Sequence, residues 1–137
     1  MYDCDYFIKK FDRISENRWC VFENKNKQGQ CCAYGHCGTD YSSEGNGLRE
    51  LDYKFTPLLN LTWIGGGRYK QSTKLADINN GLYAEYQQPT PKQRILAALY
   101  DIKRMQQPQY EDVTKSLAVL PIDEMSDIVG QKQKALI

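Results

Sequence analysis

Residues 90–105, "TPKQRILAALYDIKRM", constrain the fold more than any other stretch of this 137-residue chain. Thr90 and Gln93 have the Thr-x-x-Gln spacing of a capping box, and Pro91 occupies the first helical position, where a missing N–H is tolerated. Apolar residues follow at helical spacing, and basic residues come at the end, where the helix dipole favours cations. The pattern predicts a helix that buries one stripe, made of Ile95, Ala98, Leu99, Ile102 and Met105.

Other stretches predict helices against which this stripe can pack. Residues 3–17 place apolar side chains three and four apart, behind an aspartate that can cap the first turn. Residues 38–47, rich in Gly, Ser and Asn, predict a loop. Residues 48–55 then repeat the helical pattern until a proline at position 57 interrupts it. A short helix of small residues is expected at 31–37, and a helical turn or two is expected to end at Asn79.

Two stretches predict strands. "RWCVF", residues 18–22, is short, aromatic and β-branched, and "TWIGGGRYK", residues 62–70, has the form of a hairpin around three glycines. Together they predict a small antiparallel sheet. We therefore expect a helix-dominated α+β domain over residues 1–106, followed by a helical extension over residues 107–137 that docks on the domain or mediates oligomerisation.

The bulk composition limits the classes of function. A chain of this length can bury one core without a disulfide or metal to hold it. The 18 basic and 17 acidic residues nearly balance, which disfavours a nucleic-acid partner. The start of the chain has no signal-peptide pattern, no apolar run is long enough to span a bilayer, and the cysteine count is odd. We expect a cytoplasmic protein with free thiols, no membrane partner and no cofactor.

The segment "QGQCCAYGHCG", residues 28–38, contains three of the five cysteines and the only histidine. Its Gln-Gly-x-Cys run superficially resembles papain-like cysteine proteases, which would make Cys31 or Cys32 a nucleophile and His36 its base. A base on the nucleophile's own short helix, however, leaves little room for a substrate carbonyl, and no orienting partner can be named.

The same cysteine-rich segment offers a second reading as a metal site. Cys32, His36 and Cys37 could bind zinc with Cys4 or Cys20 as the fourth ligand, but two separated pairs are the usual pattern, and adjacent helical residues point about 100° apart. Buried cysteine behaves as a small hydrophobic residue, so packing is the interpretation that we favour.

The glycine triplet could hold an anion. Backbone amides of Gly65, Gly66 and Gly67, with the side chains of Arg68 and Lys70, are groups that grip phosphate. The segment lacks the Gly-Lys-Ser/Thr ending of a P-loop, and a hairpin turn also explains it.

Ten tyrosines are the remaining signal. Tyrosine is favoured at interfaces because it offers a large contact area at low entropy cost, which makes Tyr34, Tyr69, Tyr83 and Tyr86 interface candidates. Half-buried boundary positions explain them equally well.

The order of several motifs resembles a family. A tryptophan that opens a strand, the helix start "GQCCAYG", the "INNG" turn and the "TPKQRILAAL" helix are together similar to an uncharacterised family of small bacteriophage and bacterial proteins, a domain of unknown function. The matching positions are Trp19, Cys31 or Cys32, Ala33, Gly35, Asn79, Asn80, Arg94, Ile95 and Leu99. The resemblance implies a phage or prophage accessory protein in the host cytoplasm, and it says nothing of His36 or Cys37, where the chain departs from the pattern.

These observations favour a non-enzymatic binding module that acts on a host or phage protein or on a second copy of itself. Two alternatives stay open. One is sequestration of a nucleotide-like anion at Gly65–Lys70. The other is a thiol- or metal-dependent enzyme centred on Cys31, Cys32 and His36.

Overall fold

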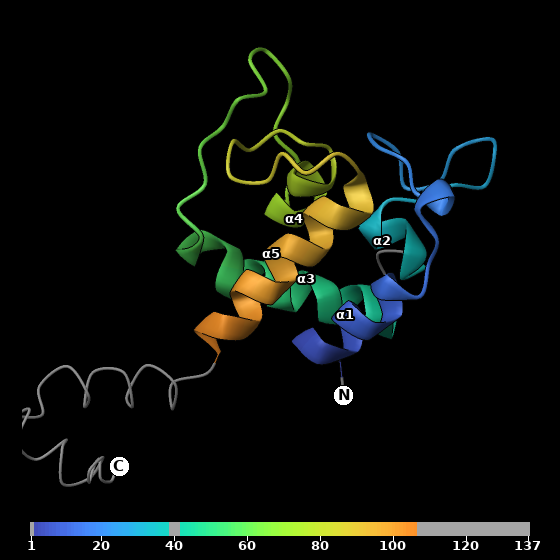
Figure 1. Cartoon of the computed structure of the whole chain (residues 1–137), viewed down its shortest axis with the longest axis horizontal. Coiled ribbons are helices and arrows are strands. Elements are labelled where there is room, and N and C mark those ends of the chain that lie inside the picture. The colour runs from blue at the N-terminus through green and yellow to red at the C-terminus, as the bar shows by residue number, and fades with distance from the viewer. Residues whose placement is uncertain (1, 39–41, 107–137) are drawn as a thin grey trace, which may run out of the picture. The chain divides into compact units, whose positions relative to one another are not determined.

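Residues 2–38 and 42–106 are described by the structure, a computed structural model, and they form a group of helices (Figure 1). The helices are α1 (Cys4–Asp12), α2 (Ala33–His36), α3 (Ser43–Phe55), α4 (Lys74–Asn79) and α5 (Pro91–Met105), with 3₁₀ turns η1 (Glu16–Arg18) and η2 (Thr56–Leu58). The extension predicted at 107–137, with its proposed docking or oligomerisation role, lies outside the described residues.

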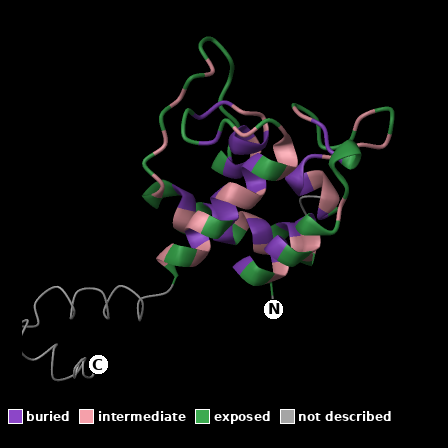
Figure 2. Ribbon diagram, in the orientation of Figure 1, coloured by how far each residue is buried: buried purple, intermediate pink, exposed green. Residues whose placement is uncertain are grey.

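The Thr90 cap and the apolar stripe of α5 are confirmed. The Gln93 N–H donates to the Thr90 hydroxyl at 3.1 Å, and the helix ends at Met105 as predicted. Its stripe is almost completely buried except at Met105, which lies at the edge. Buried positions gather on the inward faces of the helices (Figure 2). The largest buried apolar side chains are Phe7, Phe11, Leu48, Leu75, Ile78, Ile95, Leu99 and Ile102.

Helix α3 begins five residues before the predicted stretch, because residues 43–47 are helical where the sequence suggested a loop. The Ser42 hydroxyl accepts from the Gly45 N–H at 2.9 Å and caps the helix. A Cβ at position 47 would come within 2.6 Å of the Tyr2 Cβ, so glycine there lets the start of the chain approach α3. Gly47, one of the glycines that indicated a loop, serves close packing instead.

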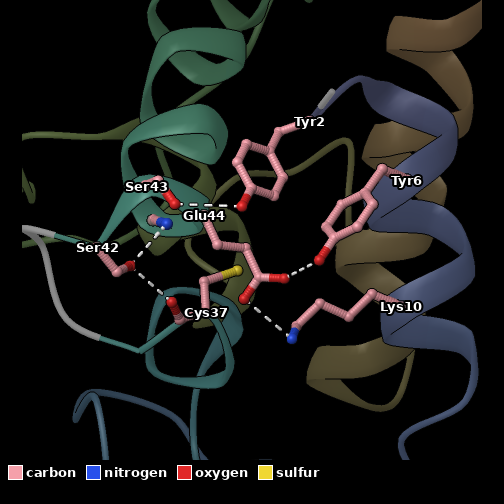
Figure 3. Close-up of polar contacts among 8 residues, drawn as sticks. Tyr2, Tyr6, Lys10, Cys37, Ser42, Ser43 and Glu44 are labelled. Atoms are coloured by element: carbon pink, nitrogen blue, oxygen red, sulfur yellow. Dashed lines mark hydrogen bonds and ion pairs between the residues drawn. The ribbon is translucent and has the colours of Figure 1, made fainter.

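Polar contacts also join α1 to the start of α3 (Figure 3). The Glu44 carboxylate accepts a hydrogen bond from the Tyr6 hydroxyl and forms an ion pair with Lys10 at 3.1 Å. The Tyr2 hydroxyl is 3.1 Å from the Ser43 hydroxyl. These contacts fix how the first helix lies against the third.

The predicted α+β class is wrong: the described residues contain no strand and no sheet, and the fold is helical. Residues 18–22 form a single isolated bridge, which joins Trp19 to Cys31. The chain leaves the extended conformation at Phe22, which has φ 66°. The Phe22 N–H then donates to the Asn80 side chain at 2.8 Å, so its hydrogen bond goes to a side chain instead of a second strand.

The predicted glycine hairpin also fails as a strand pair. The chain turns at the triplet, with the Arg68 N–H donating to the Gly65 carbonyl at 3.0 Å and Gly66 at φ 61°. However, Trp63 forms its bridge with Tyr83, not with the residues that follow the turn. One bridge is too short to count as a strand.

Two polar residues tie the helices together in the interior. The Asn79 side chain accepts from the Ala33 N–H at 3.1 Å and donates to the Cys20 carbonyl at 3.0 Å. The Arg94 guanidinium on α5 donates twice to the Asn79 carbonyl, at 2.8 and 3.2 Å. None of the helices in the described part of the chain has the length and apolar character that a membrane span requires.

Candidate functional site

A cleft of about 380 Å³ lies beside Trp63, between η2, the loop that follows it and the segment leading into α4. We call it the Trp63 cleft. It combines aromatic rings, ammonium groups, amides and a hydroxyl at one place on the surface. Its lining residues are Thr56, Pro57, Asn60, Leu61, Trp63, Lys70, Gln71, Ser72, Lys74 and Tyr83.

The aromatic wall of the cleft is held in place by the chain around it. Backbone hydrogen bonds on either side of Trp63, from the Ile64 N–H to the Leu82 carbonyl and from the Ala84 N–H to the Thr62 carbonyl, pair this segment with residues 82–84. The Trp63 ring meets the buried Tyr83 ring edge-on, with centroids 5.5 Å apart. Trp63 is therefore half-buried and fixed at its base.

The indole also rests on the glycine turn. Its N–H donates to the Gly66 carbonyl at 3.4 Å. A Cβ at position 65 would lie only 2.4 Å from the Trp63 ring, so no side chain other than hydrogen fits there without displacing the indole. The first glycine of the triplet thus serves the position of Trp63.

Two ammonium groups supply the positive charge of the cleft. The Lys70 Nζ lies over the Trp63 ring, 5.2 Å from its centroid, as a cation–π contact. Lys74 opens α4, and both lysines are exposed. Their side chains are long and flexible, so both can reach a group held in the cleft.

Two buried carboxylates lie behind this wall. Asp52 accepts hydrogen bonds from the Lys74 and Leu75 N–H groups at 3.2 and 2.9 Å, and Asp77 accepts from the Gln71 N–H at 3.0 Å. Burial raises the pKa of both carboxyl groups, against the hydrogen bonds that they accept. They bind the backbone of residues 71–75, and this stretch supplies three lining residues of the cleft, Gln71, Ser72 and Lys74.

The residues predicted to form an anion site at the glycine triplet lie in different surroundings in the structure. Lys70 lines the cleft, and Gly65 lies against Trp63. The Arg68 guanidinium instead lies over the Phe22 ring, 4.4 Å from its centroid. Gly66 and Gly67 have open space around them and do not line the cleft. Of the predicted set, Lys70 alone lines the cleft directly.

The cysteine segment is built into the interior. Cys32 caps α2, where its sulfur accepts from the Gly35 N–H and donates to the Asn24 side chain, both at 3.4 Å. Burial raises the pKa of the Cys32 thiol, although backbone hydrogen bonds lower it in part. Cys32 borders a second cleft of about 250 Å³ but is only 6% exposed. Cys31 is half-buried.

His36 does not face Cys32 as a base would. Its ring packs edge-on against Trp19, with centroids 4.6 Å apart, and burial lowers the pKa of the imidazole. Its Nε2 has no hydrogen-bond partner among the described residues. The described contacts therefore contain no thiol–imidazole pair of the kind that activates a nucleophile.

The predicted metal ligands do not come together either. Burial raises the pKa of the Cys4 and Cys37 thiols to about 12, and the Cys4 thiol donates to the Leu99 carbonyl at 3.0 Å. Over residues 2–38 and 42–106, no three side chains of His, Cys, Asp or Glu gather where they could hold a metal ion.

Three of the four tyrosines considered as an interface lie inside the protein. Tyr34 donates to the Asp52 carboxylate at 2.7 Å and Tyr86 to Asp101 at 2.5 Å, while Tyr83 backs Trp63. Tyr69, in contrast, is 87% exposed. The hydroxyls of Tyr34 and Tyr86 are satisfied internally, so neither presents the open surface of an interface residue.

The sequence reasoning missed most of the Trp63 cleft. The sequence predicts Trp63 only as part of a strand, and it predicts no role for Asn60 or Lys74. One usable signal was present, namely a tryptophan directly before a glycine run with a lysine after it. Asn60 has φ 53°, a left-handed conformation that asparagine tolerates, and this marks the sharp bend at the edge of the cleft.

Comparison with protein-family models, curated proteins and solved structures finds no match for this chain. The resemblance to a phage protein family stays a prediction.

Proposed function

We propose that this protein is a non-enzymatic binding protein whose ligand site is the Trp63 cleft and whose ligand is a small anion. The observation that carries the proposal is the position of two exposed lysines, Lys70 and Lys74, on an aromatic-walled cleft of about 380 Å³. This volume lies within the roughly 300–1,000 Å³ of ordinary small-molecule sites. Charged hydrogen bonds from ammonium groups are the usual means of holding an anion.

The state of the reactive side chains favours binding over catalysis. Cys32 acts as a helix cap, His36 packs on Trp19, and Asp52 holds the start of α4. Each of these groups already has a structural partner. Burial raises the pKa of Cys32 and Asp52 and lowers the pKa of His36, and each change favours the uncharged form. An activated nucleophile would show the opposite shift, toward the thiolate.

A protein partner is the second candidate function. Residues 58–69 contain three large exposed apolar side chains, Leu58 at 59%, Ile64 at 50% and Tyr69 at 87% exposure. Tyrosine is favoured at the centre of protein interfaces, and exposed apolar side chains that form a patch mark interaction surfaces. The partner could be a host or phage protein or a second copy of the chain. In either case we place the protein in the host cytoplasm, where its five free cysteines would stay reduced.

Isothermal titration of the full chain tests the ligand proposal. The probes are pyrophosphate, ribose 5-phosphate and adenosine monophosphate at low salt. We expect saturable binding of at least one of them, and Lys70→Gln and Lys74→Gln should each weaken it roughly ten-fold, the loss of one charged hydrogen bond. Lys27→Gln, on an exposed loop, is the matched control and should not change the affinity.

Two results would contradict the ligand proposal. One is the absence of binding to the whole panel, and the other is binding that the two cleft lysines do not affect. The second candidate is tested by the size of the full chain and of a chain ending at residue 106, measured by light scattering. If both are monomers at every concentration, self-association is excluded.

A further inference from the structure

We infer that the ligand of the Trp63 cleft carries a flat ring next to its anionic group, and that this ring stacks on the Trp63 indole in the place of the Lys70 ammonium. The inference rests on the proposed function and names its ligand class, a phosphorylated aromatic compound such as a nucleoside monophosphate. It assigns Trp63 a binding role beyond that of a wall residue.

The geometry of Trp63 provides the first step. Three contacts hold the indole: the Gly66 carbonyl accepts from its N–H, the Gly65 backbone lies against its six-membered ring, and Tyr83 meets its edge. An aromatic ring held so firmly at a cleft wall is a stacking platform, because its position needs no further ordering when a ligand arrives.

The second step concerns what covers the indole. The Lys70 ammonium lies over the ring, 5.2 Å from its centroid, and Lys70 is an exposed residue. An exposed cation–π contact is weaker than the stacking of a nucleobase on an aromatic side chain. A ligand ring can therefore displace Lys70 from the indole.

The displaced lysine then has a new partner. An anionic group attached to the ring brings a negative charge into the cleft, where Lys70 and Lys74 can both donate to it. Lys70 thus exchanges a cation–π contact for an ion pair. Arg68 does not compete, because its guanidinium lies over Phe22. Ring and charge are recognised by neighbouring groups, which is the reason to expect both in one molecule.

The polar lining supplies hydrogen bonds for the rest of such a ligand. Asn60, Gln71 and Ser72 line the same cleft and together offer amide and hydroxyl donors and acceptors. Ring nitrogens, exocyclic groups and sugar hydroxyls are the groups that these side chains recognise. A bare inorganic anion would leave the face of the indole unused.

Fluorescence and calorimetric titrations of the full chain test the inference. Adenosine monophosphate is compared with ribose 5-phosphate, which has the anion without the ring, and with adenosine, which has the ring without the anion. We expect the monophosphate to bind roughly ten-fold tighter than ribose 5-phosphate, the usual effect of one stacked base. Trp63→Leu should remove that difference, so that both compounds bind with similar affinity.

Quenching of tryptophan emission gives a second readout. Trp19 is only 4% exposed, so a stacked ligand should quench Trp63 and leave the emission of Trp19. A Trp63→Phe variant should lose the quenching and keep most of the affinity, since a phenyl ring also stacks. Circular dichroism of both variants checks that the helices are retained.

The outcomes separate the two proposals. Equal affinity for the monophosphate and ribose 5-phosphate would overturn the stacked ring and leave the anion site standing. Tight binding of the monophosphate that Trp63→Leu does not weaken would also overturn it. Absence of binding by all three compounds would overturn the proposed function and this inference together.

Discussion

The side chain of Asn79, at the end of α4, accepts a hydrogen bond from the N–H of Ala33, the first residue of α2, at 3.1 Å. Its amide also donates to the Cys20 carbonyl at 3.0 Å, and both bonds are buried. One side chain thus supplies hydrogen bonds to two segments that have no strand partner. This side chain helps to hold the stretch around Cys20, whose backbone also bonds to Cys31 at 3.0 Å.

Replacing Asn79 should therefore cost stability. In Asn79→Ala, the Ala33 N–H and the Cys20 carbonyl both lose a buried partner, at roughly 1–3 kcal/mol each. We expect urea denaturation to show a loss of about 3 kcal/mol in the free energy of unfolding. Asn46→Ala, on the exposed side of α3, is the matched control and should change stability by less than about 0.5 kcal/mol. A loss below about 1 kcal/mol in Asn79→Ala would show that water replaces the lost bonds.

The thiols should react unequally. Cys4, Cys20, Cys32 and Cys37 are buried, and burial raises the pKa of each, whereas Cys31 is half-buried. A disulfide reagent at pH 8 should modify at most one thiol rapidly in the folded protein and all five in denaturant. Cys31→Ser should abolish the rapid phase. Rapid modification that Cys32→Ser removes would instead indicate an accessible, activated thiol at the helix cap.

Stability should depend on pH through the one histidine of the chain. Burial lowers the pKa of His36 below its usual 6.5, so the unfolded chain takes up a proton at a higher pH than the folded chain does. The contribution of neutral His36 is complete above pH 6.5 and is lost as the pH falls from there through the folded pKa. The slope cannot exceed about 1.4 kcal/mol per pH unit.

Urea titrations of the wild type and His36→Gln between pH 7.5 and 5 would measure this slope. The wild type should lose stability relative to the variant as the pH falls. The comparison is needed because burial raises the pKa of Asp52 and Asp77, which favours the folded state toward low pH. Parallel curves for the two proteins would contradict the packing of a neutral ring on Trp19.

Substitution of the first and of the third glycine of the triplet should have different effects on ligand binding. A Cβ at position 65 would lie 2.4 Å from the Trp63 ring, whereas a Cβ at position 67 meets nothing within 4 Å. Gly65→Ala should displace the indole and weaken binding of adenosine monophosphate roughly ten-fold, the contribution of one stacked base. Gly67→Ala should bind like the wild type. If both variants bind normally, the ligand does not depend on where the indole lies.

Local signals in the sequence were enough to predict the longer helices. The cap formed by Thr90 marks the start of α5, as the sequence predicts. The early start of α3 was not predicted, because Gly45 and Gly47 indicated a loop although Ser42 caps the helix. Helix propensity counts each glycine as a cost, but the close approach of Tyr2 requires one there. Such a requirement depends on a residue more than 40 positions away.

The sheet was predicted wrongly for a similar reason. Alternating aromatic and β-branched residues at 18–22 have the composition of a strand, but no second strand is available to pair with them. The backbone there forms one bridge with Cys31 and otherwise bonds to the side chains of Asn79 and Asn80, which the sequence marked only as a turn.

The candidate site was likewise predictable only where it depends on local sequence. Lys70 was predicted from the glycine run beside it, while Lys74 and Trp63 join it only because residues 62–64 pair with 82–84. Charge and glycine content can be read locally. Which aromatic ring meets which ammonium group depends on the fold.

The buried Asp52 carboxylate has a consequence for how the protein unfolds. It takes hydrogen bonds from Tyr34 just inside α2, from Thr56 at the end of its own helix, and from the first two N–H groups of α4. Opening any one of these segments would take one or two donors away from a buried carboxylate, which makes separate opening costly. Amide hydrogens at this junction should exchange with deuterium only when the whole domain opens, and their rates would report its global stability.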